Sequence, residues 1–283
     1  MKETLFACYP GRSFPSFSVT GRECELDCDH CQGRHLYWMQ ELKSPDQLWE
    51  EAKKVKESGG TGMLISGGCD LEGRIGIAPY VGVIRAVKRE LGLLINIHAG
   101  NVSPEEAECL ASSEADLFSL DVHQDPLVID GPLHRPGRKE DYVRSMEALL
   151  ASGAKVVPHI TVGLSKQDAL QSVQALAGKG FERAVVLVLI PTPGTPICAL
   201  PMPDDEDVLV IVDMLKNMGI EPIMGCMRPR GDHRLEIECV KRGVRTIALP
   251  SRKTVEWARN NGFEVRDVPL CCALSDKWPL SPV

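Results

Sequence analysis

Near-continuous apolar runs alternate with helix-length segments along almost the whole chain, and this alternation constrains the fold more than any other feature of the sequence. Strands that lack a polar face are buried on both sides, which is typical of a parallel sheet covered by helices. The expected strands are residues 14–20, 62–66, 93–98, 116–122, 155–161, 184–190, 219–224 and 244–249. The expected helices lie near residues 45–58, 77–91, 103–113, 138–152, 166–178, 204–218, 232–242 and 251–261, with Ser44, Ser103 and Ser165 among the N-caps.

Eight such βα units predict an α/β fold, a (β/α)8 barrel of the TIM type. A partial barrel of six units with a carboxy-terminal extension stays open, because the apolar run at 219–224 is weak. The length of 283 residues fits one domain over residues 1–283, with an irregular leader at 1–13 and a cysteine-containing tail at 263–283. We expect that tail to fold back over the barrel mouth.

The net charge of −7 argues against a nucleic-acid partner, which would require a basic face. No window approaches a membrane span and the start has no long apolar segment, so we expect a cytoplasmic protein that does not contact membranes. Eleven cysteines in such a chain indicate metal or redox chemistry rather than a disulfide framework.

Three of these cysteines, Cys24, Cys28 and Cys31, are spaced C-x3-C-x2-C directly after the first expected strand. We call residues 24–31 the cysteine loop. Three close thiolates can hold three irons of a [4Fe–4S] cluster and leave the fourth iron open for a small ligand. The alternatives are a zinc site, for which His30 is an awkwardly placed fourth ligand, and three unrelated thiols. In α/β barrels the chemistry lies where strands end and βα loops begin, and the cysteine loop occupies such a position.

The cysteine loop resembles the signature of the radical S-adenosylmethionine (SAM) superfamily. In that family the open iron chelates SAM, and reductive cleavage of SAM gives a 5′-deoxyadenosyl radical that abstracts hydrogen from the substrate. His30 stands where many members have an aromatic residue. The segment Gly67-Gly68-Cys69-Asp70 follows the second expected strand, where members typically have Gly-Gly-Glu in contact with the methionine part of SAM. The resemblance therefore implies that Gly67, Gly68 and Asp70 line the SAM site.

Polar side chains also follow later strands. His98 and Asp121 end the third and fourth, His123 comes two residues after Asp121, and His159 lies within the fifth. Asp121 and His123 should point to the same face of the sheet. We expect these four to bind the ribose of SAM or the substrate by hydrogen bonds, or else to be satisfied structural residues.

A second group of cysteines lies late in the chain: Cys226 follows the seventh expected strand, and Cys271 and Cys272 lie in the tail. Adjacent cysteines seldom pair with each other, so these three, which we call the donor thiols, are expected to hold an auxiliary [4Fe–4S] cluster, with Cys69 as a fourth ligand. The alternative is that they are buried as small hydrophobic groups. Cys8, Cys109, Cys198 and Cys239 are expected to have no such role.

Several segments resemble the biotin-synthase-like proteins that form the two-component lipoyl synthase of archaea and some bacteria. They are Ser18 to Gly21, Pro158 to Ile160 with Gly163-Leu164, Pro191 to Pro196, Gly225 to Gly231 and the closing Cys-Cys-Ala-Leu. This resemblance implies radical SAM insertion of sulfur from the auxiliary cluster into an octanoyl chain on a carrier protein or peptide. It also implies a paralogous radical SAM partner and an electron donor such as ferredoxin or flavodoxin. Arg228 and Arg230 beside Cys226 are expected either to steer an acidic carrier or anchor the substrate, or to be solvated surface.

Two other functions stay open. The first is a single-cluster radical SAM enzyme of carbon-skeleton rearrangement or cofactor maturation, in which the late cysteines are structural. The second is a zinc-stabilised barrel that binds a partner without redox chemistry.

Overall fold

The computed structural model describes residues 3–278, which form one curved, entirely parallel sheet of eleven strands. The strand order is β11-β1-β10-β9-β8-β7-β6-β5-β4-β2-β3, so β11 and β3 are the edges and the sheet is a partial TIM-type barrel. The strands are β1 (Thr4–Cys8), β2 (Ser16–Ser18), β3 (Gln40–Glu41), β4 (Gly62–Ser66), β5 (Leu94–His98), β6 (Leu117–Asp121), β7 (Val156–Val162), β8 (Arg183–Val188), β9 (Glu221–Met224), β10 (Thr246–Ala248) and β11 (Glu264–Val268).

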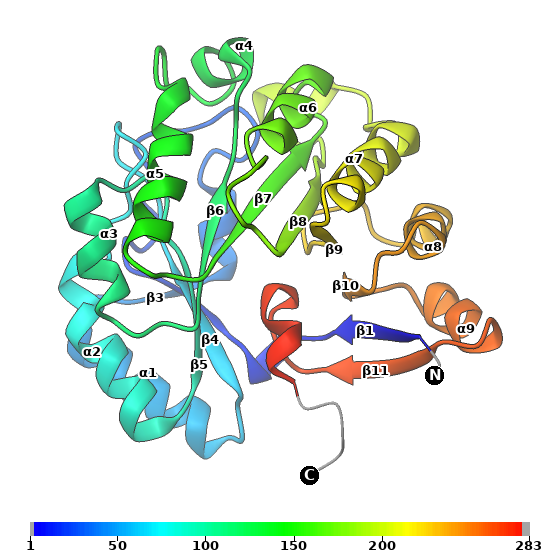
Figure 1. Cartoon of the computed structure of the whole chain (residues 1–283). Coiled ribbons are helices and arrows are strands. Elements are labelled where there is room, and N and C mark those ends of the chain that lie inside the picture. Colours follow the sequence, from blue (N-terminus) through cyan, green and yellow to red (C-terminus); the bar gives the residue numbers. More distant parts are fainter. Residues whose placement is uncertain (1–2, 279–283) are drawn as a thin grey trace.

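The helices lie around the outside of the sheet (Figure 1). They are α1 (Pro45–Glu57), α2 (Val81–Ala86), α3 (Pro104–Ala111), α4 (Pro126–Asp130), α5 (Lys139–Ala151), α6 (Lys166–Gln174), α7 (Asp205–Asn217), α8 (His233–Lys241) and α9 (Arg252–Asn260). The three serine caps are confirmed: Ser44, Ser103 and Ser165 each accept a hydrogen bond from a backbone N–H of the first helical turn. No helix of residues 3–278 is long and apolar enough to cross a membrane.

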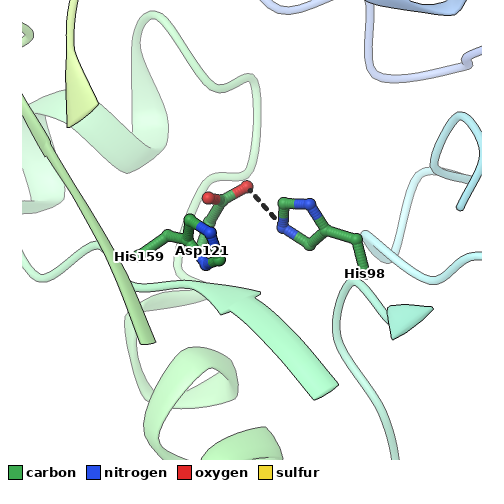
Figure 2. Close-up of side chains that lie close together, drawn as sticks. All are labelled: His98, Asp121 and His159. Carbon is green, nitrogen blue, oxygen red and sulfur yellow. Dashed lines mark ion pairs between the residues drawn. The ribbon is translucent and has the colours of Figure 1, made fainter. Parts of the chain in front are cut away.

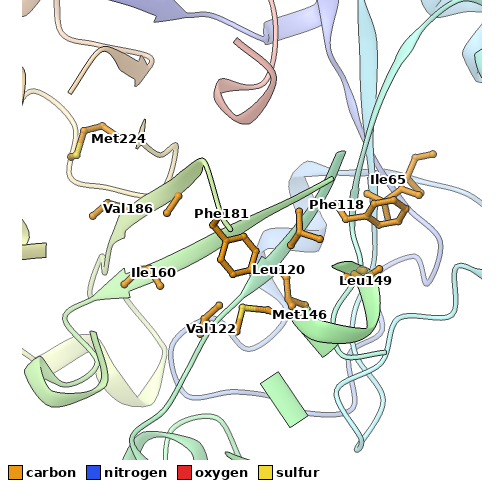
Figure 3. Packing of buried hydrophobic residues seen from close by; sticks show 14 of the residues in the cluster. Ile65, Phe118, Leu120, Val122, Met146, Leu149, Ile160, Phe181, Val186 and Met224 are labelled. Carbon is orange, nitrogen blue, oxygen red and sulfur yellow. The ribbon is translucent and has the colours of Figure 1, made fainter. Parts of the chain in front are cut away.

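Side chains of each strand alternate between two apolar cores. On β6, Phe118 and Leu120 pack outward against α5, where Met146 and Leu149 meet them (Figure 3). Leu117 belongs to a second core on the inner, concave face. Both faces of the sheet are therefore buried over much of its height, which explains why the strands read as near-continuous apolar runs.

All eight expected strands are present, but the leader was wrongly expected to be irregular. Residues 4–8 form β1, which pairs with β10 and β11 rather than with β2. The five-residue apolar run of β1 is too short for its pattern to separate a strand from a loop, and its partners lie more than 230 residues away in the sequence.

The carboxy-terminal tail lies inside the barrel, not over its mouth as expected. We call residues 269–277 the plug; they include the short 3-10 helix η6 (Cys272–Lys277), drawn in red within the curve of the sheet in Figure 1. Arg183, the first residue of β8, donates to Ser275 Oγ at 2.6 Å, and Thr61, just before β4, donates to the Pro269 carbonyl at 2.8 Å. These contacts place the plug at the amino-terminal ends of the strands. Residues 279–283 of the expected tail lie outside the described part of the chain.

The plug lies inside the barrel because the inner core needs apolar cover. Leu117, Val157, Val185 and Ile223 face the barrel axis and need apolar cover, which the plug residues Leu270, Ala273 and Leu274 supply. The plug thus closes the end of the barrel opposite the mouth.

Candidate active site

The cysteine loop follows β2 and runs to the short helix η2 (Arg34–Trp38). Two non-glycine residues have left-handed backbone, Asp27 (φ 45°) within the loop and Gln32 (φ 46°) just after it, and they fold this segment into tight turns. Cys28 is buried beside Leu133, whose carbonyl accepts from its thiol at 3.5 Å, while Cys24 and Cys31 are half-buried. All eleven cysteines are free thiols, so no disulfide competes for this loop.

The spacing of these thiols fits an iron–sulfur cluster better than a zinc ion. Sulfurs bound to one tetrahedral zinc lie about 3.8 Å apart. Within residues 3–278, the cysteine loop contributes no group of three Cys, His or carboxylate ligand atoms within 4.8 Å of one another. Burial raises the pKa of Cys31 to about 11, and burial together with the charges of Cys31 and Cys24 raises that of Cys28 further, so thiolates here need a cation to neutralise them. Cys24, Cys28 and Cys31 are the residues that would hold the cluster.

His30 belongs to no group of three ligand atoms within 4.8 Å of one another in residues 3–278, so it does not complete a zinc site with the three cysteines. Its Nδ1 is buried without a hydrogen-bond partner in the described chain, and desolvation lowers its pKa to about 4.

The Gly67-Gly68 turn after β4 packs directly onto the cysteine loop. A Cβ on Gly68 would lie 1.9 Å from the Glu23 carbonyl oxygen and 2.7 Å from Cys24 Cα. Gly68 N donates to Thr20 Oγ1 at 2.7 Å, just ahead of the cysteine loop. Only glycine can fill this position, and the turn lies directly against the cysteine loop. Its contact with SAM stays a prediction.

Two other residues of this segment have contacts that the sequence did not indicate. Asp70 is exposed, and its Oδ1 accepts from the backbone N–H groups of Glu72 and Arg74 at 2.9 Å each, so it caps its own turn, and its place at the SAM site stays a prediction. Cys69 was expected beside the donor thiols, but it lies with the cysteine loop, where its backbone N–H donates to Cys24 Sγ at 3.4 Å. The backbone pairing of Glu25 N to Cys69 O at 2.8 Å holds it there.

We expect a Cys69→Ala variant to retain the wild-type iron content after anaerobic reconstitution. The interaction with Cys24 uses the backbone N–H of Cys69, which alanine keeps, and the side chain of alanine fits the same space. Iron and sulfide analysis of the purified variant checks this. A loss of about four irons per chain would instead make the Cys69 thiol a cluster ligand.

Three of the four expected polar residues meet on the concave face of the sheet. His98, Asp121 and His159 come from the neighbouring strands β5, β6 and β7 and point toward one another (Figure 2). His98 Nε2 lies 3.3 Å from Asp121 Oδ2, and the His98 and His159 rings stack with centroids 5.2 Å apart. Desolvation opposes the charged form of Asp121, but the charge of His98 and its hydrogen bond outweigh it and keep the pKa of Asp121 below its ordinary range.

His123 does not join them. Its Nδ1 is 2.7 Å from Asp168 Oδ2 of α6, and its ring packs edge-on against Tyr142 of α5. β6 ends at Asp121, so the alternation that would have placed both side chains on one face does not continue to His123. His123 is therefore a structural residue with satisfied contacts, which is the second of the two roles expected for it.

Two of the donor thiols, Cys271 and Cys272, lie in the plug itself, and the third, Cys226, is exposed in the loop after β9. Cys271 Sγ accepts from Asn96 Nδ2 of β5 at 3.5 Å, and the interaction with the adjacent Cys272 thiol lowers the pKa of Cys271 to about 7. Desolvation, and next the charge of Cys271, raise the pKa of Cys226.

A fourth thiol, Cys8, was expected to be incidental but belongs to the same region. It ends β1, is fully buried in the inner core with Cys272, and has its pKa raised to about 12 by burial and by the charge of Cys271. The sequence signal that could have found it is the apolar run before Pro10-Gly11, which puts Cys8 at a strand end.

Arg228 is neither a carrier-steering group nor solvated surface. It is 1% exposed and donates to the carbonyls of Gly225, Ala248 and Leu249 and to Glu236 Oε1 at 2.5–3.0 Å. Arg230 is exposed, and its Nη2 donates to the Cys226 carbonyl at 2.6 Å. Both arginines therefore hold the backbone of the loop that carries Cys226.

The proline-rich loop after β8 reaches the cysteine loop across the mouth. Arg34, three residues after Cys31, donates to the Pro193 carbonyl at 3.0 Å and to the Gly194 carbonyl at 2.8 Å. These contacts hold the loop against the segment that follows the cysteine loop.

Among known proteins, residues 18–169 match the Radical SAM superfamily. No curated protein sequence is significantly similar to the chain. Solved structures with this fold include the FeFe-hydrogenase maturase HydG from Carboxydothermus hydrogenoformans, with 19% identity and a TM-score of 0.63 over 90% of this chain and 68% of HydG. Methylornithine synthase (PylB) has 14% identity and a TM-score of 0.63 over 93% of this chain and 84% of PylB. SuiB from Streptococcus suis bound to S-adenosylmethionine has 15% identity and a TM-score of 0.56 over 77% of this chain and 51% of SuiB.

At these identities the solved structures establish the fold alone. The superfamily match covers more than half of the chain and includes both the cysteine loop and the Gly67-Gly68 turn packed against it. Membership implies that a [4Fe–4S] cluster and SAM bind at this end of the barrel. The chain therefore belongs to the radical SAM superfamily and is a radical SAM enzyme.

Proposed function

We propose that this enzyme inserts sulfur at an unactivated carbon of a protein-bound octanoyl chain, in the manner of a lipoyl synthase, with an auxiliary cluster as the sulfur donor. The observation that carries the proposal is the position of the late cysteines: Cys271 and Cys272 lie in the plug within the inner core, and Cys226 is exposed in the loop after β9. A radical enzyme that only rearranges carbon bonds has no need of a second thiol group there. When bound, the two clusters and SAM would supply the radical and the sulfur atom.

The residues of the chain would orient the reactants and exclude water. The plug covers the far end of the barrel with Leu270, Ala273 and Leu274, which keeps bulk water out of the interior on that side. Asn96 and the backbone of η6 hold Cys271 at the top of the plug, and the Arg228 network fixes the loop of Cys226. An acyl chain entering at the mouth would thus pass between the cysteine loop and the donor thiols.

The side chains at the rim of the mouth favour a substrate that is bound to a protein. Several large apolar side chains on the βα loops are exposed: Tyr37 (59%), Trp38 (86%), Leu71 (68%) and Leu127 (82%). These loops follow β2, β4 and β6, at the carboxyl ends of the strands. Exposed apolar groups around an opening are typical of a docking surface. We infer that an octanoylated carrier protein or peptide docks there, and that a paralogous radical SAM partner and a ferredoxin or flavodoxin reductant share the surface in turn.

One observation favours the alternative, a single-cluster enzyme of carbon-skeleton rearrangement or cofactor maturation. Cys272 is 5% exposed and Cys8 is fully buried among apolar side chains, as expected of cysteines that only fill space. The two functions differ in the number of irons bound per chain.

The test is iron and sulfide analysis of anaerobically reconstituted protein. We expect about eight irons per chain in the wild type and about four in a Cys226→Ala, Cys271→Ala, Cys272→Ala triple variant. A Cys109→Ala, Cys198→Ala variant is the matched control, because both thiols are exposed and lie on the surface. Equal iron near four per chain in the wild type and the triple variant would leave the single-cluster function.

Sulfur insertion itself requires a product assay. An octanoyl-lysine peptide incubated with wild-type enzyme, SAM and dithionite should gain sulfur by mass spectrometry, and ³⁴S used to build the clusters should appear in the product. The triple variant should still cleave SAM but form no thiolated peptide.

A further inference from the structure

The cluster of His98, Asp121 and His159 is not explained by the proposed reaction. His98 and Asp121 are the last residues of β5 and β6, and His159 is the middle residue of β7. The sheet register pairs Asp121 directly with His159, so the two side chains leave neighbouring strands at the same level on the concave face. Figure 2 shows the three side chains converging from these strands.

The geometry is that of a metal-ligand set. One ligand atom from each residue lies within 4.8 Å of the other two, and no other group of three His, Cys, Asp or Glu side chains in residues 3–278 meets that criterion. The distance of 3.3 Å between His98 Nε2 and Asp121 Oδ2 matches the edge of a coordination polyhedron with bonds of about 2.0–2.1 Å. The rings of His98 and His159 are tilted by only 22°, and one nitrogen of each lies within 4.8 Å of one nitrogen of the other.

The cluster also lacks partners. Nδ1 of His159 is buried and has no hydrogen-bond partner in the described chain. Across residues 3–278, no lysine or arginine pairs with Asp121, whose only ion-pair partner is His98. Asp121 is 45% exposed and His98 28% exposed, so the set is open toward the barrel interior.

We propose that His98, Asp121 and His159 bind one divalent transition-metal ion, separate from any iron–sulfur cluster. Two imidazoles and one carboxylate suit Fe²⁺, Mn²⁺ or Zn²⁺ better than Mg²⁺ or Ca²⁺, which prefer oxygen ligands. Three protein ligands leave coordination positions free, and the exposure of Asp121 directs these toward the interior. An oxygen or nitrogen donor of the substrate can occupy them. The site uses no cysteine, so it does not depend on sulfur insertion being the reaction.

The experiment uses reconstituted holoenzyme titrated with Mn²⁺ under anaerobic conditions. Free Mn²⁺ gives a six-line EPR signal at room temperature that is lost on binding, oxidised [4Fe–4S] clusters are diamagnetic, and Mn²⁺ binds thiolates weakly. We expect one saturable Mn²⁺ site per chain in the wild type. Asp121→Asn and His159→Gln variants should bind Mn²⁺ at least about tenfold more weakly.

His233→Ala is the matched control, because His233 lies on α8 away from the site and its loss should leave Mn²⁺ affinity unchanged. Spin-echo modulation of Mn²⁺ bound to the wild type should show nitrogen couplings from histidine, and this readout requires no variant to fold. Saturable binding that survives both variants, no saturable binding in the wild type, or bound Mn²⁺ without nitrogen couplings would each overturn the proposal. After either of the last two results, hydrogen bonding to SAM or to the substrate would remain as the function of these side chains.

Discussion

Replacing Gly68 with alanine is expected to reduce SAM cleavage by about 10²-fold or more and to prevent normal assembly of the cluster. The new Cβ would lie 1.9 Å from the Glu23 carbonyl oxygen and 2.7 Å from Cys24 Cα. Both are backbone atoms, so no side-chain rotation can relieve the overlap. The cysteine loop must move away from the Gly67-Gly68 turn, and Cys24 moves with it.

The measurement is iron content together with the rate of 5′-deoxyadenosine formation. Gly76→Ala is the matched control in the same βα loop, because a Cβ there meets nothing within 4 Å. Its iron content and rate should equal those of the wild type. Wild-type values for Gly68→Ala would show that the two loops do not hold each other in place.

Breaking the buried Arg228–Glu236 pair is expected to cost about 3–5 kcal/mol of unfolding free energy. The two side chains are 1% and 3% exposed, and Nη2 of Arg228 lies 2.6 Å from Glu236 Oε1. Glu236→Gln leaves the Arg228 guanidinium buried without its counter-charge. Arg228→Met leaves the Glu236 carboxylate buried without its counter-charge. The double variant removes both charges, so its loss should be less than the sum of the single losses by about 1–3 kcal/mol.

Urea unfolding of the four proteins measures this coupling. The exposed pair Arg252–Glu256, with side chains 91% and 51% exposed, is the control, and Glu256→Gln should leave the urea midpoint unchanged. Strictly additive losses at Arg228 and Glu236 would mean that the carbonyl contacts of Arg228, not the ion pair, stabilise the loop of Cys226.

The parts of the fold that sequence could predict are those in which local pattern and tertiary environment agree. The runs at 62–66 and 184–190 are apolar on both faces, as β4 and β8 require, and serines at helix starts cap the helices they precede. β1 and the plug could not be predicted, because their structure depends on partners far away in the chain. β1 is a short run beside β10, and the plug enters the barrel only because inner side chains such as Ile223 need cover.

The candidate site also has parts that the sequence could predict and parts that it could not. The cysteine loop and the Gly67-Gly68 turn are continuous segments, so spacing alone indicated their place. The contacts of Cys69, Asp70 and His123 could not be predicted because the direction of a side chain after a strand depends on local turns. Asp70 caps its own turn, and His123 turns away to Asp168 once β6 has ended. The alternation rule holds within a strand and fails two residues beyond it.

The pairing of β1 between β10 and β11 has a consequence for how the enzyme acquires its metal. Contacts between the first and last strands have the largest sequence separation possible in this chain, so they should form late in folding. The plug follows β11 and is synthesised after everything it touches. Until the plug docks, the end of the barrel that it covers stays open, so small ions have a route into the interior from below that the finished barrel lacks. Maturation is then tied to the order of folding, because loading from below ends when the plug docks.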